Sequence, residues 1–258
     1  MLNVETMKML FIICPLIFLA GLIDAIAGGG GIISLPAYIV AGLPPHLATG
    51  TNKCSSTCGT LFSTLRFMRS KKIHYIAAIT SAGAALIGSP IGATINMIIE
   101  ERYLGYTMLV LLPIIALFLV FKKDFGDKIK IQQESKYKII GLSLLSGFLI
   151  GMYDGFFGPG TGTFLILIYT GIIGFDLVTA SGNAKVVNLS SNVAALVTFA
   201  LNGKVVWHIG LLAAIFGIAG NWIGAGLAIK GGKKIIRPMF MVVLALLIIK
   251  IGYDLFLV

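Results

Sequence analysis

Charged residues are scarce in this 258-residue chain: Asp, Glu, Lys and Arg together make up 12% of it, whereas apolar residues make up 57%. A soluble domain has too little interior to hide that much apolar surface, so lipid must cover much of it. Acidic residues are the scarcest, with 10 Asp and Glu against 20 Lys and Arg, which gives a net charge of +10. The basic residues lie mainly in short loops between apolar stretches. This is the orientation signal of membrane proteins, not the footprint of a nucleic-acid-binding surface.

Cysteine is rare and the common catalytic signatures are missing. The three cysteines lie inside apolar segments, which argues against a disulfide framework, and their spacing fits no zinc pattern. The glycine-rich runs Gly28–Gly31 and Gly158–Gly162 lack the spacing of a nucleotide-binding loop, and no Gly-Lys-Ser/Thr follows them, so ATP-driven transport is unsupported. No Gly-x-Ser-x-Gly elbow or His-Glu-x-x-His helix is present. We therefore expect neither an enzyme nor a bound cofactor or metal ion.

Apolar runs divide the chain into ten segments, several of which reach the roughly 20 residues that a helix needs to cross about 30 Å of hydrocarbon. The sequence thus predicts an all-α integral membrane protein with one compact membrane domain. Segments 30–42 and 160–174 are too short for a comfortable crossing, so they either cross thinly or form re-entrant hairpins with their predecessors. The other eight segments are 7–27, 46–68, 74–98, 104–121, 137–157, 180–201, 206–229 and 235–257.

The two halves of the chain match each other in one register over about a hundred residues. Gly21-Leu22-Ile23-Asp24 aligns with Gly151-Met152-Tyr153-Asp154, and after a two-residue slip Lys53 aligns with Lys185. The matched Asp and Lys pairs make the repeat persuasive, because small and apolar residues alone would be weak evidence for it. It divides the chain into a first membrane repeat (1–121), a basic cytoplasmic linker (122–136) and a second membrane repeat (137–258). Further matches are Gly28 with Gly158, Gly30 with Gly160, Gly50 with Gly182, Phe67 with Phe199, Gly88 with Gly220, and Gly92 with Gly224.

The charges of the loops predict that the repeat is inverted. The basic loops 66–72, 122–138 and 230–237 should all be cytoplasmic. In the repeat, the last of them corresponds to Glu100-Glu101-Arg102, which lies one span away from both basic loops of the first half and so faces outside. Equivalent loops on opposite sides mean inverted repeats of about five helical segments each, with both termini outside the cytoplasm. Inverted repeats with broken helices at matching positions are a transporter architecture that binds its substrate near the midplane.

Four charged residues lie well inside apolar segments, as the repeat-related pairs Asp24 with Asp154 and Lys53 with Lys185. A charge at the bilayer centre costs at least ~2.5–3.5 kcal/mol on insertion scales, so such residues face a polar cavity or a partner. Lys53 follows Pro45 by eight residues, which places it roughly 12 Å into the membrane, too deep for easy snorkelling. We interpret the lysines as an anion-attracting pair in a central cavity. The alternative is that each pairs with an aspartate of the same or the other half and holds the bundle together.

Small polar residues surround each lysine and can donate hydrogen bonds to an oxyanion, although such side chains also join membrane helices to one another. They are Thr49, Thr51, Asn52, Ser55 and Ser56 near Lys53, and Ser181, Asn183, Asn188 and Asn192 near Lys185.

The glycine breaks at Gly28–Gly31 and Gly158–Gly162 each precede the start of a helix. Free backbone N–H groups there, at the positive end of the helix dipole, can bind an anion, whereas the alternative is close helix packing through small residues. Asp24 and Asp154 stand just before the breaks, where a carboxylate could carry a coupling proton, cap the broken helix or neutralise a lysine. Besides the two lysines, we expect the substrate to contact Gly30, Gly31, Ser34, Thr51, Asn52, Gly160, Thr161, Gly162, Thr163, Asn183 and Asn188.

Two sets of motifs, one in each half, carry a resemblance to a known family. The first set is Gly21–Gly31, Leu35-Pro36 and Ala48–Lys53, and the second is Gly151–Gly162 and Ala180–Lys185. On these motifs, over essentially the whole chain, the sequence resembles the sulfite exporter TauE/SafE family of membrane proteins.

This resemblance implies a secondary transporter that exports or exchanges small sulfur-containing oxyanions, such as sulfite, or organosulfonates, such as sulfoacetate, by alternating access. The alternatives are a passive anion channel and a transporter of another small anion. The expected partners are a small anionic substrate and the lipid bilayer of the cell membrane, with a homodimer left open and no nucleic acid.

Overall fold

The computed structural model describes residues 4–100, 103, 135–239 and 241–242, and every regular element in these ranges is a helix. Five helices are long and apolar enough to cross a membrane, which confirms the predicted all-α class and several of the predicted spans. They are α1, α4, α6, α8 and α9. The full order is α1 (Val4–Ala27), α2 (Gly31–Val40), α3 (Pro45–Arg69), α4 (Tyr75–Ile98), α6 (Lys136–Phe156), α7 (Thr161–Ile168), the π-helix η2 (Tyr169–Ile173), α8 (Leu177–Leu201) and α9 (Trp207–Gly231).

The observed helices begin and end within a few residues of the predicted segments. Helix α3 has 25 residues, as many as α8 and α9, but it is not counted among the apolar spans because polar side chains fill one stretch of it. The predicted segment 104–121, most of the linker 122–136 and most of segment 235–257 lie outside the described residues.

Local signals account for several helix starts. Pro45 opens α3, at a position where the missing N–H of proline would have no partner in any case. Asp176 precedes α8, and its carboxylate accepts hydrogen bonds from the backbone N–H groups of Val178 and Thr179. His74 caps α4 in the same way, because its Nδ1 accepts a hydrogen bond from the N–H of Ala77.

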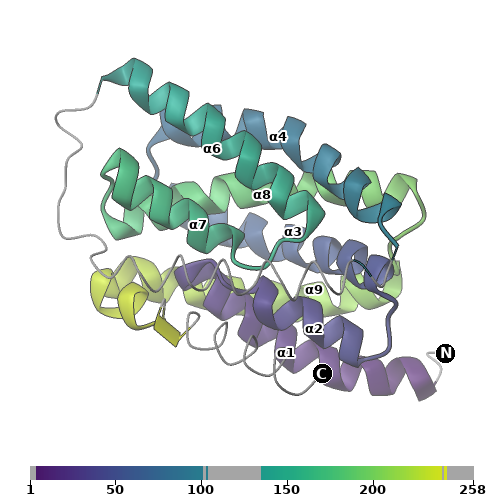
Figure 1. Ribbon diagram of the computed structural model, residues 1–258. Helices are drawn as coiled ribbons and strands as arrows, with labels where there is room; N and C mark the ends of the chain where they lie inside the picture. The colour runs from purple at the N-terminus through teal and green to yellow at the C-terminus, as the bar shows by residue number, and fades with distance from the viewer. Residues whose placement is uncertain (1–3, 101–102, 104–134, 240, 243–258) are drawn as a thin grey trace, which may run out of the picture.

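The helices form three layers, which Figure 1 shows from the side. The middle layer holds α3 and α8, with α4 and α6 packed together on one side and α1 and α9 packed together on the other. Helices α3 and α8 are antiparallel. Lys53, early in α3, contacts Asn192, late in α8, whereas Thr64, late in α3, contacts Lys185, early in α8.

Glycines let the outer helix pairs approach to backbone contact. A Cβ on Gly88 of α4 would collide with the carbonyl oxygen of Phe148 in α6, and a Cβ on Gly220 of α9 would collide with that of Phe18 in α1. Gly88 and Gly220 are matched in the sequence repeat, so the same contact occurs once in each outer pair. Close approach through small residues is how membrane helices gain packing energy where lipid removes the hydrophobic drive.

The two short helices follow the glycine breaks predicted from the sequence. Helix α2 has 10 residues, which is about 15 Å of rise and only half of the hydrocarbon thickness. Gly30, just before α2, packs against Ala20 and Asp24, so the chain folds back along α1 after the break. Helix α7 has 8 residues and continues into the five-residue π-helix η2. Neither segment is long enough to cross the membrane comfortably.

Packing between α4 and α6 can be tested at two glycines of the same helix. The Cβ of a Gly92→Ala variant would collide with the carbonyl oxygen of Met152, whereas nothing lies within 4 Å of a Cβ added at Gly83. Overpacking costs typically ~1–3 kcal/mol, so we expect Gly92→Ala to lower the melting temperature of the purified protein in detergent. Gly83→Ala is the matched control and should leave it unchanged or raise it, because alanine favours the helix. Equal melting temperatures for the two variants would contradict the described contact.

Candidate functional site

The two glycine breaks meet inside the bundle. A Cβ on Gly28 would collide with the backbone of Gly162, and a Cβ on Gly162 would collide with Gly28. Gly28 also has a φ of +79°, in the left-handed region that side chains disfavour. Thr163 of α7 donates a hydrogen bond from its hydroxyl to the carbonyl oxygen of Ala27, over 2.9 Å, and so ties the start of one short helix to the end of α1.

Two buried ion pairs flank this junction, and each joins one half of the chain to the other. Lys53 Nζ lies 2.8 Å from Asp154 Oδ2, and Lys185 Nζ lies 2.7 Å from Asp24 Oδ2. The lysine side chains are 2% and 0% exposed, so neither reaches the surface of the bundle. Pairing with an aspartate, of the same half or of the other half, is the alternative role that the sequence predicts for each lysine, and the structure has the pair across the halves. The lysines are therefore partly neutralised in this structure.

The Lys53–Asp154 pair has additional hydrogen-bond partners. Asp154 Oδ2 also accepts a hydrogen bond from the hydroxyl of Ser191, over 2.6 Å, and its Oδ1 accepts one from Thr161, over 2.9 Å. Lys53 Nζ donates to the amide oxygen of Asn192, over 3.0 Å. Hydrogen bonds of this kind offset the cost of keeping a charged pair away from water.

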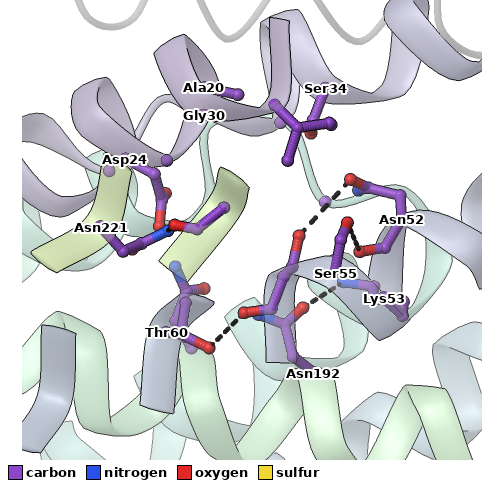
Figure 2. Close-up of a pocket in the computed structure, with 18 of the residues that line it drawn as sticks. Ala20, Asp24, Gly30, Ser34, Asn52, Lys53, Ser55, Thr60, Asn192 and Asn221 are labelled. Carbon is purple, nitrogen blue, oxygen red and sulfur yellow. Dashed lines mark hydrogen bonds between the residues drawn. The ribbon is translucent and has the colours of Figure 1, made fainter. Parts of the chain in front are cut away.

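A polar cavity of about 40 Å³ lies beside the ion pairs, between α1, α2, α3, α6, α8 and α9. One water molecule needs at least ~10–15 Å³ by the same measure, so the cavity suits a few waters or a solute of a few heavy atoms. Figure 2 shows Asp24 and Asn221 on one side of it and Lys53 and Asn52 on the other. Its polar and glycine lining is Gly21, Asp24, Gly28, Gly30, Gly31, Ser34, Asn52, Lys53, Ser55, Ser56, Thr60, Asp154, Gly158, Asn188, Asn192, Gly217 and Asn221.

Many of the residues predicted to bind substrate or to carry a coupling proton line this cavity, and the others are not in its lining. The predicted residues in the lining are Asp24, Gly30, Gly31, Ser34, Asn52, Lys53, Asp154 and Asn188. Lys185 is fully buried against Asp24. The predicted residues of the second break that are not in the lining are Gly160, Thr161, Gly162 and Thr163.

Thr51 and Asn183 are not in the lining and form hydrogen bonds with backbone groups just before two helices. The hydroxyl of Thr51 accepts a hydrogen bond from the backbone N–H of Val206, over 3.0 Å. The amide oxygen of Asn183 accepts a hydrogen bond from the backbone N–H of His74, also over 3.0 Å. Val206 and His74 each precede a long helix, α9 and α4. The two contacts are therefore equivalent in the repeat, and each anchors one half to the central helix of the other.

Thr60, Gly217 and Asn221 belong to the cavity but were not predicted from the sequence. Asn221 offered a signal, since it is an amide in the middle of the otherwise apolar helix α9, and polar side chains inside a membrane helix usually contact a polar group. Within the described part of the chain, the amide oxygens of Asn188 and Asn221 are buried without a hydrogen-bond partner. Both residues line the cavity, so these atoms are available to a bound solute or water.

No metal site accompanies these groups in the part of the chain that the structure describes: no three His, Cys, Asp or Glu side chains lie close enough to hold an ion. The arrangement offers instead two lysines, several amides and hydroxyls, and the start of α2, where Gly30 and Gly31 line the cavity.

Comparison with known proteins identifies the class to which this chain belongs. Residues 13–251 match the model of a family described as "Sulfite exporter TauE/SafE". A protein of Haemophilus influenzae described as "Probable membrane transporter protein" is 37% identical over 242 residues, which are 92% of each chain. The Escherichia coli K12 protein "Probable membrane transporter protein YfcA" is 33% identical over 260 residues, covering 97% of this chain and 95% of its own. No solved structure matches the chain.

The match covers nearly all of the chain, so this protein belongs to the sulfite exporter TauE/SafE family of membrane transporters. The resemblance that the motifs indicated is thereby confirmed.

The stability of the Lys53–Asp154 pair can be tested by removing one charge. Leaving a buried charge without its partner costs ~3–5 kcal/mol, so we expect Asp154→Asn to lower the melting temperature in detergent strongly. The double variant Lys53→Met with Asp154→Asn should be less destabilised than Asp154→Asn alone, because no unpaired charge remains. Asp176→Asn, a helix cap that asparagine also fills well, is the control and should change little. An unchanged melting temperature for Asp154→Asn would contradict a buried pair.

Proposed function

We propose that this protein is a secondary transporter that exports or exchanges small sulfur-containing oxyanions, sulfite or organosulfonates, by alternating access. The observation that carries the proposal is the small polar cavity where the two helix breaks meet, with a buried lysine in its wall and a second behind it. The name of the family to which the chain belongs supports a sulfur oxyanion as the substrate class.

The chemistry of the lining suits a compact anion with several oxygen atoms. Lys53 supplies a positive charge, and Asn52, Asn192 and nearby hydroxyls supply hydrogen-bond donors. The first residues of α2 add backbone N–H groups at the positive end of a helix dipole. A sulfite or sulfonate group presents three oxygen acceptors, and charge-assisted hydrogen bonds to such oxygens are stronger than those between neutral groups.

The small volume of the cavity favours a carrier over the alternative, a passive anion channel. A channel needs a continuous polar path, whereas here the polar groups gather in a cavity of about 40 Å³ at the junction of the halves. Ligand sites at the meeting point of two broken helices are typical of transporters that rock one repeat against the other.

We also propose that residues 1–121 and 137–258 are inverted repeats, joined by a cytoplasmic linker. The antiparallel packing of α3 and α8 supports this arrangement, because these helices are equivalent in the repeat. The C-terminal ends of α3 and α9 and the N-terminal end of α6 lie at one end of the bundle, on the left of Figure 1. Basic residues gather at these three ends, which supports a cytoplasmic location for that face.

Transport can be tested with purified protein in proteoliposomes, using a panel of labelled anions that includes sulfite, sulfoacetate, sulfate and chloride. We expect flux of sulfite or an organosulfonate, and we expect Lys53→Ala and Lys185→Ala to reduce it at least tenfold, because each removes a buried charge at the site. Lys230→Ala removes an exposed charge at the end of α9 and is the matched control, with flux like that of the parent. Transport unaltered in both site variants, or a large conductance that ignores ion gradients, would contradict the proposal.

The orientation can be tested by cysteine labelling in a variant without native cysteines. Glu100→Cys and Lys234→Cys stand in equivalent loops of the two halves, so a membrane-impermeant thiol reagent should reach them from opposite sides of the membrane. Lys71→Cys is a reference for the basic face and should be labelled from the same side as Lys234→Cys. Labelling of positions 100 and 234 from one side would rule out inverted repeats.

A further inference from the structure

The four charges at the junction of the halves sum to zero. Lys53 and Lys185 carry two positive charges, and Asp154 and Asp24, their partners, carry two negative ones. An anion that enters the adjoining cavity therefore adds a negative charge that nothing compensates, beside charged side chains that are at most 15% exposed. Such a charge is unfavourable unless a second charge is taken up with it.

The two carboxylates differ in how firmly their negative charge is held. Asp154 accepts hydrogen bonds on both oxygens, from Lys53 and Ser191 on Oδ2 and from Thr161 on Oδ1. Each of these donors favours the ionised carboxylate, because a protonated acid would have to give up one of them. Both aspartates line the cavity, but the Asp154 side chain is 5% exposed against 15% for that of Asp24, so water reaches Asp154 less.

Asp24 has a single donor. Lys185 reaches its Oδ2, and no other donor in the described part of the chain forms a hydrogen bond with this carboxylate. The cause lies in the sequence: Gly59 and Gly31 occupy the positions that Ser191 and Thr161 occupy in the other half, so the first half lacks both hydroxyls. The Asp24 side chain is 15% exposed and lines the cavity, so a proton or a solute can reach it.

An acceptor that no described residue pairs with belongs to the same cavity as Asp24. Asn221 lines the same cavity and packs against Gly21, one helical turn before Asp24. Its amide oxygen is buried and has no partner within the described residues. The other charged groups near Asp24 are Lys185, Lys53 and Asp154. Helix α2 contributes one titratable side chain, Tyr38, whose hydroxyl donates a hydrogen bond to Ser55 over 2.7 Å. Helix α7 and the cavity-facing part of α9 contribute none.

We propose that Asp24, and not its repeat partner Asp154, takes up a proton when the anion binds, so that one proton crosses with each singly charged anion. The inference rests on the proposed anion transport. Protonation converts the Asp24 carboxylate into a neutral acid and leaves the ammonium group of Lys185 unpaired, so the site has a net charge of +1 for the anion to neutralise. When the anion leaves on the other side, the proton leaves with it and the Lys185–Asp24 pair forms again.

The test uses the full-length protein in proteoliposomes with labelled sulfite, at a pH acidic enough for hydrogen sulfite to be the main form. Exchange between sulfite inside and outside tests the proposed transport on its own. Net uptake is then measured under an inward proton gradient and, separately, under a membrane potential set with potassium and valinomycin. Protein-free liposomes correct for sulfur dioxide that crosses the lipid. With one proton per anion, a tenfold proton gradient should drive up to roughly tenfold accumulation, and the potential should have no effect.

Variants separate the two carboxylates. Asp24→Asn mimics the protonated acid, so it should lose stimulation by the proton gradient, and any exchange that remains should be insensitive to pH. Ser191→Ala takes a donor from Asp154 but keeps both carboxylates, and should keep the ratio of stimulated to unstimulated uptake seen in the parent. Asp24→Glu retains a titratable group and should also keep stimulation.

Three results would overturn the inference: uptake by the parent that follows the membrane potential, stimulation that survives in Asp24→Asn, or stimulation that Ser191→Ala abolishes. If Asp24→Asn does not fold, the response of the parent to the potential still decides whether one proton accompanies each anion, and Ser191→Ala still tests whether Asp154 is the proton carrier. Failure of sulfite exchange in the parent would instead reject sulfite transport itself.

Discussion

The structure depends on the cost of placing charges where lipid excludes water. Two ammonium groups and two carboxylates lie within the membrane-spanning part of the chain, and each would be strongly unfavourable alone. Each lysine finds its carboxylate on the other half of the chain, at 2.8 Å for Lys53 and 2.7 Å for Lys185. The antiparallel central helices α3 and α8 supply the lysines, and the packing of α1 and α6 beside them supplies the aspartates.

This pairing also defines what the cavity can offer to a solute. Lysines that are already paired do not present two bare positive charges. The site is therefore polar and nearly neutral, and its lining combines Asp24, Lys53 and Asp154 with amides and hydroxyls. Small volume and many hydrogen-bonding groups favour a compact, oxygen-rich solute over a large or apolar one. Membership of a family named for sulfite export is consistent with that chemistry.

Much of the fold could be predicted because apolar length and glycine breaks are one-dimensional signals. The helix limits, the short segments after Gly28 and Gly158, and the equivalent contacts of Gly88 and Gly220 follow from run length and repeat register. The partner of each lysine could not be predicted, because repeat register shows which residues are equivalent but not which ones touch.

The candidate site was harder to predict residue by residue. Thr51 is a polar neighbour of Asn52, and Asn183 has the same side chain as Asn188, yet in the structure Thr51 and Asn183 accept hydrogen bonds from the backbone just before helices α9 and α4. Which of two neighbouring polar residues faces the cavity depends on the rotation of the helix about its axis. A stretch in which most residues are polar gives no sequence signal for that rotation. Asn221 was missed for the opposite reason, since it is a single amide in an apolar helix.

The crosswise ion pairs have a consequence for how such a protein can be divided. A chain cut between α4 and α6 yields two fragments, and each carries one lysine and one aspartate whose partners are on the other fragment. Neither fragment can satisfy its own charges by these contacts, so each is an incomplete folding unit in the bilayer. Co-produced fragments should associate, because assembly removes that penalty. Loss of either half would leave the other with unpaired charges, so the two halves should be retained together in evolution.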